Sequence, residues 1–349
     1  MEAKELKFNT GTLRYSGIIG TGGIGSGKFF VLNGDHTLGR EESRSGHFLP
    51  VNDYCKQHII LHYVKVLLGP LFSVIPIGKI GDDDIGKVLF EEMSETGFKM
   101  NNVEVVPEVS TLFSFCFYYP DGSGGNLTTD NSASSKVDTA LIDKAETEIQ
   151  KLGSKGIIMA APEVPVSARQ RLLESGKKYG LFCTASFTSE EINCAMDDGI
   201  MANVDLIAIN IDEAAAIAGS QVDKMDIHLI VQSAILKLQL YNKNIMVSVT
   251  AGKNGSWCWD GHKLNSFPVI KTEVISTAGA GDAFFSGIIC GLTLGLTLFE
   301  AQQLATLVAG LSVSSPDTIH KGVDRQSLNK YLKSSDLTFS EKIIKLLED

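Results

Sequence analysis

Cysteine pairs are the first feature that the sequence lacks. Its six cysteines are spread over 349 residues, and no two of them form a C-x-x-C pair. In a chain of this length, isolated cysteines are typical of reduced thiols in a protein core, and neither a disulfide framework nor a structural zinc site is expected. The chain is also long enough to bury a large hydrophobic core.

A long hydrophobic segment is missing as well. The most apolar stretch, 288–298, is short and is interrupted by Gly291 and Gly295, so it cannot span a bilayer. Residues 1–14 mix acidic and basic side chains and contain no apolar stretch of the kind found in a secretory signal. We therefore expect a cytoplasmic protein that does not bind membranes.

The sequence has fewer basic residues than acidic ones. There are 31 lysines and arginines against 41 aspartates and glutamates, which gives a net charge of −10 at pH 7. A protein whose main partner is a nucleic acid usually carries an excess of basic residues, so this balance favours a small-molecule ligand. Because 44% of the residues are hydrophobic and 21% are charged, the composition does not suggest a disordered or fibrous chain.

Segments of strand and helix character alternate along most of the chain, which is typical of an α/β fold. Near-continuous apolar runs such as 206–209 are expected in strands of a parallel sheet that is covered on both faces. We expect strands at 15–20, 29–32, 72–77, 103–106, 112–119, 156–160, 181–184, 204–209 and 245–250, a hairpin over 255–267, and helices at 53–68, 85–96 and from about 280 onward.

The alternation stops in two parts of the chain. Residues of about 28–50 and 103–130 are rich in strand formers but have no helices between the strands. These two parts are predicted to form a small β lid over the main sheet. Residues 1–12 are expected to be an N-terminal tail, and residues 13–349 a single domain that includes the lid.

A glycine-rich segment near the N-terminus matches two nucleotide-binding patterns. Residues 20–25 fit G-x-G-x-x-G, and residues 22–28 fit the start of a P-loop. Both patterns require a helix to follow, because its free amides hold the phosphates. Here a strand at 29–32 and a turn at 33–35 are expected instead, and Phe29 stands where a P-loop needs Ser or Thr. We interpret the segment as a flexible glycine turn; close approach of a substrate to the backbone is the alternative.

The segment with the strongest chemical signal is 276–287, S-T-A-G-A-G-D-A-F-F-S-G. It follows a strand-like run and opens a helix rich in small residues. The turn Gly279-Ala280-Gly281 has little side-chain bulk, so several backbone amides can point at one spot and bind an anion. Asp282 then lies beside the place where negative charge would develop. On the residues alone, an ordinary helix start with an acidic first turn explains the pattern equally well.

The same segment is similar to the C-terminal signature of the ribokinase-like, PfkB-type carbohydrate kinases, D-T-x-G-A-G-D followed by a large apolar residue. The resemblance covers about residues 13–320 and implies a three-layer α/β/α fold with a mostly parallel central sheet and a small β lid. It also implies an ATP-dependent kinase in which the amides of Gly279, Ala280 and Gly281 stabilise the transferring phosphoryl group. In that family the Asp that corresponds to Asp282 removes the proton from the accepting hydroxyl group.

Two further positions of the signature bear on cofactors. Thr277 matches the family pattern and is implied to bind the nucleotide. Ser276 stands where the family usually has Asp, which helps to hold a monovalent cation in many members. Because that carboxylate is missing here, we expect little dependence on potassium.

The residues from Asn210 to Glu213 follow a predicted strand and resemble the family's N-x-x-E motif. In the family, this Glu and Asn help to place Mg²⁺ and the phosphates through water, so the resemblance implies that Glu213 contributes to a Mg²⁺ site and Asn210 to the nucleotide site. The residues by themselves suggest a capping box, in which Asn and the Glu three positions later satisfy a helix start. One pair of residues can serve both purposes.

The turn T-A-G-K-N-G after the strand 245–250 resembles the T-x-G-x-x-G turn that runs beside ATP in the family. The resemblance therefore implies that Thr250, Gly252 and Gly255 lie at the nucleotide. The N-terminal part fits the family least, because the glycine pair and Asn that contact the sugar before the first long helix are not recognisable. Asn52 is the nearest candidate.

These features together predict a kinase that transfers the γ-phosphate of ATP, with Mg²⁺, to a hydroxyl group of a small sugar or sugar-like acceptor bound at Asp282. A nucleoside kinase and a vitamin kinase of the pyridoxal type share the same architecture and base. A sugar-binding regulator without catalysis is the alternative from another class. A small two-sided lid leaves an apolar face or edge exposed, so a homodimer joined through the lids is also expected.

Overall fold

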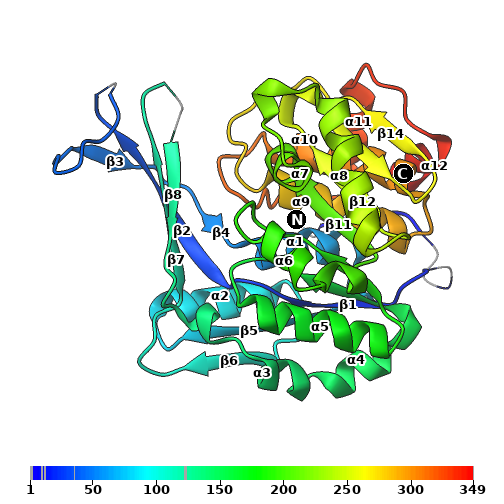
Figure 1. Ribbon diagram of the computed structural model, residues 1–349, viewed down its shortest axis with the longest axis horizontal. Coiled ribbons are helices and arrows are strands. Elements are labelled where there is room, and N and C mark those ends of the chain that lie inside the picture. Colours follow the sequence, from blue (N-terminus) through cyan, green and yellow to red (C-terminus); the bar gives the residue numbers. More distant parts are fainter. Residues whose placement is uncertain (1–2, 9–10, 12, 35, 122–123, 349) are drawn as a thin grey trace.

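The computed structural model describes residues 3–8, 11, 13–34, 36–121 and 124–348. Part of the predicted tail, Asp35 of the predicted turn at 33–35, and residues 122–123 of the predicted lid lie outside the described residues. The described parts form a large mixed sheet flanked by helices and a smaller sheet that projects from it (Figure 1).

The large sheet has nine strands in the order β14-β13-β12-β11-β10-β9-β1-β5-β6. Its strands from β12 to β6 are parallel, and only the hairpin β13–β14 at one edge is antiparallel. The strands are β1 (Gly17–Thr21), β5 (Ser73–Gly81), β6 (Asn102–Val106), β9 (Gly156–Ala160), β10 (Phe182–Ala185), β11 (Leu206–Asn210), β12 (Met246–Thr250), β13 (Ser256–Trp259) and β14 (Leu264–Phe267).

Successive residues of the central strands enter two different hydrophobic cores. Ile18 of β1 packs into one core and Ile19 into the other, and Ile157 and Ile158 of β9 divide in the same way, because side chains alternate across a strand. One core lies under α1 (Lys56–Leu68), α2 (Asp84–Glu95), α9 (Ala280–Thr293), α10 (Leu298–Ser312), α11 (Arg325–Ser334) and α12 (Glu341–Leu347). The other lies under α3 (Thr139–Lys144), α4 (Glu146–Leu152), α5 (Val166–Lys178), α6 (Ile192–Asp197), α7 (Ile211–Ala218) and α8 (Ile227–Tyr241). The predicted three-layer α/β/α architecture is confirmed.

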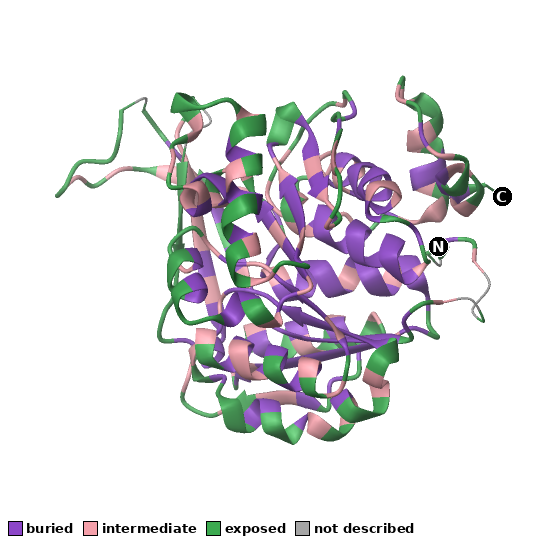
Figure 2. Ribbon diagram, turned by 45° about the vertical axis from the view of Figure 1, so that its right-hand side comes forward, coloured by how far each residue is buried: buried purple, intermediate pink, exposed green. Residues whose placement is uncertain are grey.

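The smaller sheet is the lid. Its path is β3-β2-β7-β8, and β4 also pairs with β2; the strands are β2 (Gly25–Leu32), β3 (Gly46–Phe48), β4 (Asp53–Tyr54), β7 (Leu112–Tyr118) and β8 (Gly124–Thr128). The lid extends away from the helical layers (Figure 1). In Figure 2 the purple of buried residues is concentrated in the central sheet and its helices, whereas the projecting part is mainly green and pink.

Two boundaries predicted from the sequence are wrong: the start of the second part of the lid and the start of the first long helix. The segment 103–106 was assigned to the lid but forms β6, which pairs in parallel with β5 at the edge of the main sheet. The helix expected over 53–68 begins only at Lys56, and Asp53 and Tyr54 pair with β2 inside the lid. Both errors have one cause: local strand and helix propensity does not specify which partner a short segment pairs with.

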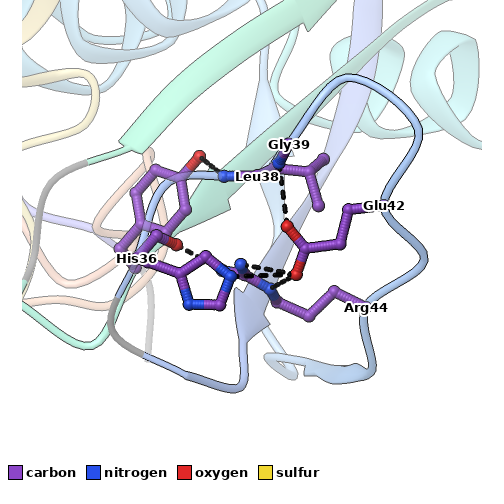
Figure 3. Close-up of polar contacts among 6 residues, drawn as sticks. His36, Leu38, Gly39, Glu42 and Arg44 are labelled. Carbon is purple, nitrogen blue, oxygen red and sulfur yellow. Dashed lines mark hydrogen bonds and ion pairs between the residues drawn. The ribbon is translucent and has the colours of Figure 1, made fainter.

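The loop between β2 and β3 is held in shape by one carboxylate (Figure 3). Glu42 accepts hydrogen bonds from the backbone amide of Gly39 (2.8 Å) and from the guanidinium group of Arg44 (2.7 and 3.0 Å). These contacts, first of all the Gly39 amide, lower the pKa of Glu42 to about 2. The amide of Leu38 also donates to the hydroxyl oxygen of Tyr119 (3.1 Å), so the loop is tied to the end of β7.

The glycine-rich segment 20–27 is not a flexible turn, which corrects the interpretation from sequence. It passes from β1 directly into β2, and no helix follows it, so neither nucleotide-binding pattern is realised. A Cβ atom at Gly23 would lie 2.5 Å from Oε2 of Glu163, and one at Gly27 would lie 1.9 Å from Oδ2 of Asp53. The absence of a side chain at Gly23 and Gly27 leaves room for these carboxylates, while Gly20, Gly22 and Gly25 are packed closely against Met159, Ala161 and Leu112.

None of the helices in the described ranges is both long and apolar enough to cross a membrane.

Candidate active site

Five of the ten predicted site residues meet at the carboxyl ends of the parallel strands, where β9, β11 and β12 end and α7 and α9 begin. In parallel α/β sheets, ligands bind at the carboxyl ends of the strands. The structure has a pocket there, lined by Lys56, Pro162, Ser186, Phe187, Ala208, Ile209, Asn210, Glu213, Ser248, Thr250, Gly281, Asp282, Phe284 and Phe285. Asp282, Gly281, Asn210, Glu213 and Thr250 were all predicted from the sequence.

The start of α9 depends on Gly279. This residue has a left-handed backbone with φ of 77°, and a Cβ atom on it would lie 2.7 Å from the carbonyl oxygen of Thr318. Both facts favour glycine at this position. The turn places Asp282 in the first turn of α9 with its side chain only 15% exposed.

The amides of the Gly-Ala-Gly turn are not equivalent. The amide of Ala280 donates to the carbonyl oxygen of Thr277 (3.2 Å) within the same turn. The amides of Gly281 and Asp282 belong to the first turn of a helix, where no intrahelical acceptor exists. Gly281 also lines the pocket, and a Cβ atom built on it would meet nothing within 4 Å. The open side of the turn therefore lies at Gly281.

Asp282 faces a lysine that the sequence did not single out. Nζ of Lys56 lies 4.0 Å from Oδ1 of Asp282. Burial raises the pKa of Asp282 above its ordinary value, and the ammonium group of Lys56 opposes that rise. In return, Asp282 is the largest cause that raises the pKa of Lys56. The pair therefore keeps opposite charges next to each other in a largely buried place.

Asn210 and Glu213 form a reciprocal capping box at the start of α7. The side chain of Asn210 accepts from the amide of Glu213, and the side chain of Glu213 accepts from the amide of Asn210, both at 2.8 Å. Burial raises the pKa of Glu213 to about 7, while the Asn210 amide and Lys56 act in the opposite direction. The capping interpretation is thus realised, and both residues also line the pocket.

The remaining predicted nucleotide residues are dispersed. Thr250 ends β12 and lines the pocket. Gly252 and Gly255 shape the turn after β12 with φ of 52° and 87°, and neither is in the pocket wall. Thr277 is exposed just before α9. Gly252, Gly255 and Thr277 are not among the residues that line the pocket.

Glu163 belongs to the same site, although no motif in the sequence singled it out. It follows β9 and has φ of 75°, an uncommon backbone conformation for a residue other than glycine. Its Oε2 accepts from the backbone amide of Lys56 (3.3 Å). Burial raises the pKa of Glu163 to about 7. An acidic residue just after a buried parallel strand was the signal that could have identified it.

Of the neighbouring residues Asn52 and Asp53, Asp53 is the one whose side chain points into the protein. Asp53 is 8% exposed, and its Oδ2 accepts from the hydroxyl group of Ser114 on β7 (3.0 Å). Asn52 is exposed, and its backbone amide and carbonyl bind the side chain of Asp317 and the amide of Thr318. Asn52 therefore anchors a loop and does not line the site.

Residues 62–325 match the pfkB family of carbohydrate kinases, which is well over half of the chain. The chain belongs to this family. The match begins at residue 62, after β4 and Lys56. The N-terminal segment, in which the sequence fits the family least, therefore lies outside the match. The predictions of the family and of an ATP-dependent carbohydrate kinase are confirmed.

Relatives and solved structures agree with this membership. The chain is 22% identical to a ribokinase of Lactococcus lactis over 69% of its own length and 73% of that protein. It is 23% identical to an adenosine kinase of Saccharomyces cerevisiae, over 69% of this chain and 72% of that protein. The structure of Arabidopsis thaliana ribokinase complexed with ribose and ATP superposes with a TM-score of 0.72 at 18% identity, covering 91% of this chain and 99% of that one. The ribokinase-like fold of this pfkB kinase is confirmed.

Proposed function

We propose that this pfkB kinase transfers the γ-phosphate of ATP to a hydroxyl group of a small sugar or sugar-like acceptor, with Asp282 as the general base. The observation that supports this role is the position of Asp282. Its carboxylate lies in the pocket wall one residue after Gly281, whose amide has no intrahelical acceptor because it belongs to the first turn of α9. A base and an anion-binding amide side by side suit phosphoryl transfer.

The proposed reaction uses this arrangement. The acceptor hydroxyl donates its proton to Asp282 while its oxygen forms a bond to the γ-phosphorus. The bond between that phosphorus and the β–γ bridging oxygen breaks, and ADP leaves with the electron pair. The amide of Gly281 and the N-terminus of α9 stabilise the negative charge on the transferring group. Water must be kept away during this step, because it would otherwise accept the phosphoryl group.

The residues present are compatible with Mg²⁺ held through water and phosphate oxygens. Mg²⁺ at kinase sites usually has one or two carboxylates, water and substrate phosphates around it. Glu213 supplies a carboxylate at the pocket, and Asn210 lies beside it. No group of three or more His, Cys, Asp or Glu side chains in the described part of the chain is arranged to hold a metal ion directly. When bound, Mg²⁺ would neutralise phosphate charge in this pocket.

For the acceptor, the relatives suggest two classes. The Lactococcus lactis relative is named a ribokinase and the Saccharomyces cerevisiae relative an adenosine kinase. A free sugar is our first choice, because carbohydrate kinase is the description of the whole family. We also propose a cytoplasmic location and a homodimer joined through the lids.

An ATP-consumption screen with pentoses, hexoses, hexose phosphates and nucleosides tests this function. One acceptor should stimulate ATP consumption in the wild-type protein, and Asp282→Asn should lower kcat by roughly 10²–10⁴ while ATP binding and melting stay close to wild type. Asp84→Asn is a matched control, because Asp84 is an exposed first-turn aspartate of α2 outside the site. Near-normal turnover in a folded Asp282→Asn protein would contradict the assignment. Tight acceptor binding without turnover in the wild type would indicate a regulator.

A further inference from the structure

Lys56 is placed where helix electrostatics disfavour it. It is the first residue of α1, and this helix has no acidic residue in its first turn. The N-terminus of a helix carries a partial positive charge, so a cation there is destabilising by itself. A lysine at this position therefore has to be stabilised by something outside its own helix.

That stabilisation comes from α9, which packs against α1 in register. One turn along each helix from Lys56 and Asp282, the hydroxyl group of Ser286 lies 3.2 Å from the carbonyl oxygen of Ile60 and 2.7 Å from that of Asp282. The two helices thus meet at Lys56–Asp282 and again, four residues later on both, at Ile60–Ser286. The distance of 4.0 Å between Nζ and Oδ1 follows from the packing of two helices and not from a chance surface contact.

The groups around the pair are mostly acidic. Glu163, from the loop after β9, and Glu213, from α7, both act on the charge of Lys56, as does the buried thiol of Cys55. Asp53 of β4 and Tyr63 of α1 are influenced by the charge of Asp282. Among these groups, Lys56 is the one whose positive charge lowers the pKa of Asp282. It is 39% exposed and lines the pocket, so its ammonium group is within reach of a bound oxyanion.

We propose that Lys56 is a positioning residue for phosphoryl transfer: its ammonium group keeps the Asp282 carboxylate ionised and directed into the pocket. This inference rests on the proposed role of Asp282 as the base. A carboxylate that is buried among other acids tends to hold its proton, and a protonated Asp282 cannot accept the proton of the acceptor hydroxyl. A fixed cation on the neighbouring helix removes that difficulty without filling the space in which the acceptor binds.

Carbon-13 NMR of labelled aspartate carboxyl groups tests this in the acceptor-free protein. The resonance of Asp282 is assigned by its loss in Asp282→Asn and then followed with pH. Lys56→Met should raise the pKa of Asp282 by about one to three units, and Lys56→Arg should keep it near wild type. Lys342→Met is the matched control: Lys342 also pairs with a carboxylate in the first turn of a helix, Glu300 of α10, at 3.1 Å. It should leave Asp282 unchanged.

An unchanged titration of Asp282 in folded Lys56→Met overturns the inference, whatever the protein catalyses. If Lys56→Met does not fold, Lys56→Gln serves in its place. With the acceptor found by the screen, the acid limb of kcat/KM against pH should move upward in Lys56→Met by the same amount as the NMR titration. If the titration shifts but no acceptor supports turnover in the wild type, the inference about Lys56 stands and the proposed catalytic function is the part that fails.

Discussion

The carboxylate of Glu213 and the side chain of Asn210 hold each other's backbone amides at 2.8 Å in both directions. The pair thus satisfies the start of α7 and at the same time faces the pocket that contains Asp282. A capping role and a metal-binding role make different demands on Glu213, so the two can be separated by experiment.

Glu213→Gln should raise the Mg²⁺ concentration needed for half-maximal rate with little loss of stability. A glutamine oxygen still accepts the Asn210 amide, but it is a much weaker partner for a hydrated cation than a carboxylate. Mg²⁺ titration of the rate and thermal melting measure the two effects. Glu300→Gln is the control, because Glu300 occupies the same position of a capping box on α10 away from the site. A stability loss of about 0.5–2 kcal/mol with unchanged Mg²⁺ dependence would restrict Glu213 to capping.

Ionisation of Glu163 should make the folded protein less stable as the pH rises. Burial raises its pKa from 4.5 to about 7, so the folded protein binds this proton more tightly than the unfolded chain. The stabilisation is complete below about pH 4.5 and is lost as the pH rises through 7. Glu163→Gln, which stays neutral, should therefore melt higher than wild type at pH 8 and show a flatter dependence of Tm on pH between 5 and 8. Glu174→Gln, at an exposed position of α5, should follow the wild type. If the Tm of Glu163→Gln depended on pH in the same way as the Tm of the wild type, ionisation of Glu163 would not destabilise the folded protein.

Replacement of Na⁺ by K⁺ at constant ionic strength should change the rate little. Ser276 stands where a carboxylate would be needed as a charged ligand, and its hydroxyl oxygen already accepts the amide of Ala278 (3.3 Å). Steady-state rates in K⁺, Na⁺ and a bulky organic cation measure this. A strong requirement for K⁺ would show that backbone carbonyl groups alone hold the ion.

The lid should mediate a homodimer. Every residue of β8 is exposed, and Phe48 and Leu127 on the lid are 58% and 62% exposed. An exposed apolar sheet with a free edge strand is stabilised by pairing with another copy. Light scattering at micromolar concentration should give twice the mass of 37.6 kDa, and Leu127→Lys should shift the protein to a monomer. Leu236→Lys, at a similarly exposed leucine of α8, should not. A monomeric wild type would exclude the lid-paired dimer.

The features that could be predicted from the sequence are those whose physical causes are local. Near-continuous apolar runs identified strands of a covered parallel sheet, and the capping pattern of Asn210 and Glu213 was readable because both residues belong to one turn. The Gly-Ala-Gly turn before Asp282 was readable for the same reason, since its φ and its free amides depend on neighbours in the chain.

The residues that surround Asp282 from distant parts of the sequence could be identified only after the chain was folded. Asp53 and Lys56 come from one segment and Glu163 from another that lies more than 100 residues farther along the chain, and neither segment matches a motif that names its partners. They meet because α1 packs on α9 and because β4 and the end of β9 lie beside the glycine-rich segment.

The glycine-rich segment and β6 also depend on contacts between residues that are far apart in the sequence. Gly27 and Gly23 leave room for carboxylates that are 26 and 140 residues farther along the chain, and the place of β6 depends on pairing with β5. Such contacts depend on packing over long sequence separations, about which local propensity carries no information.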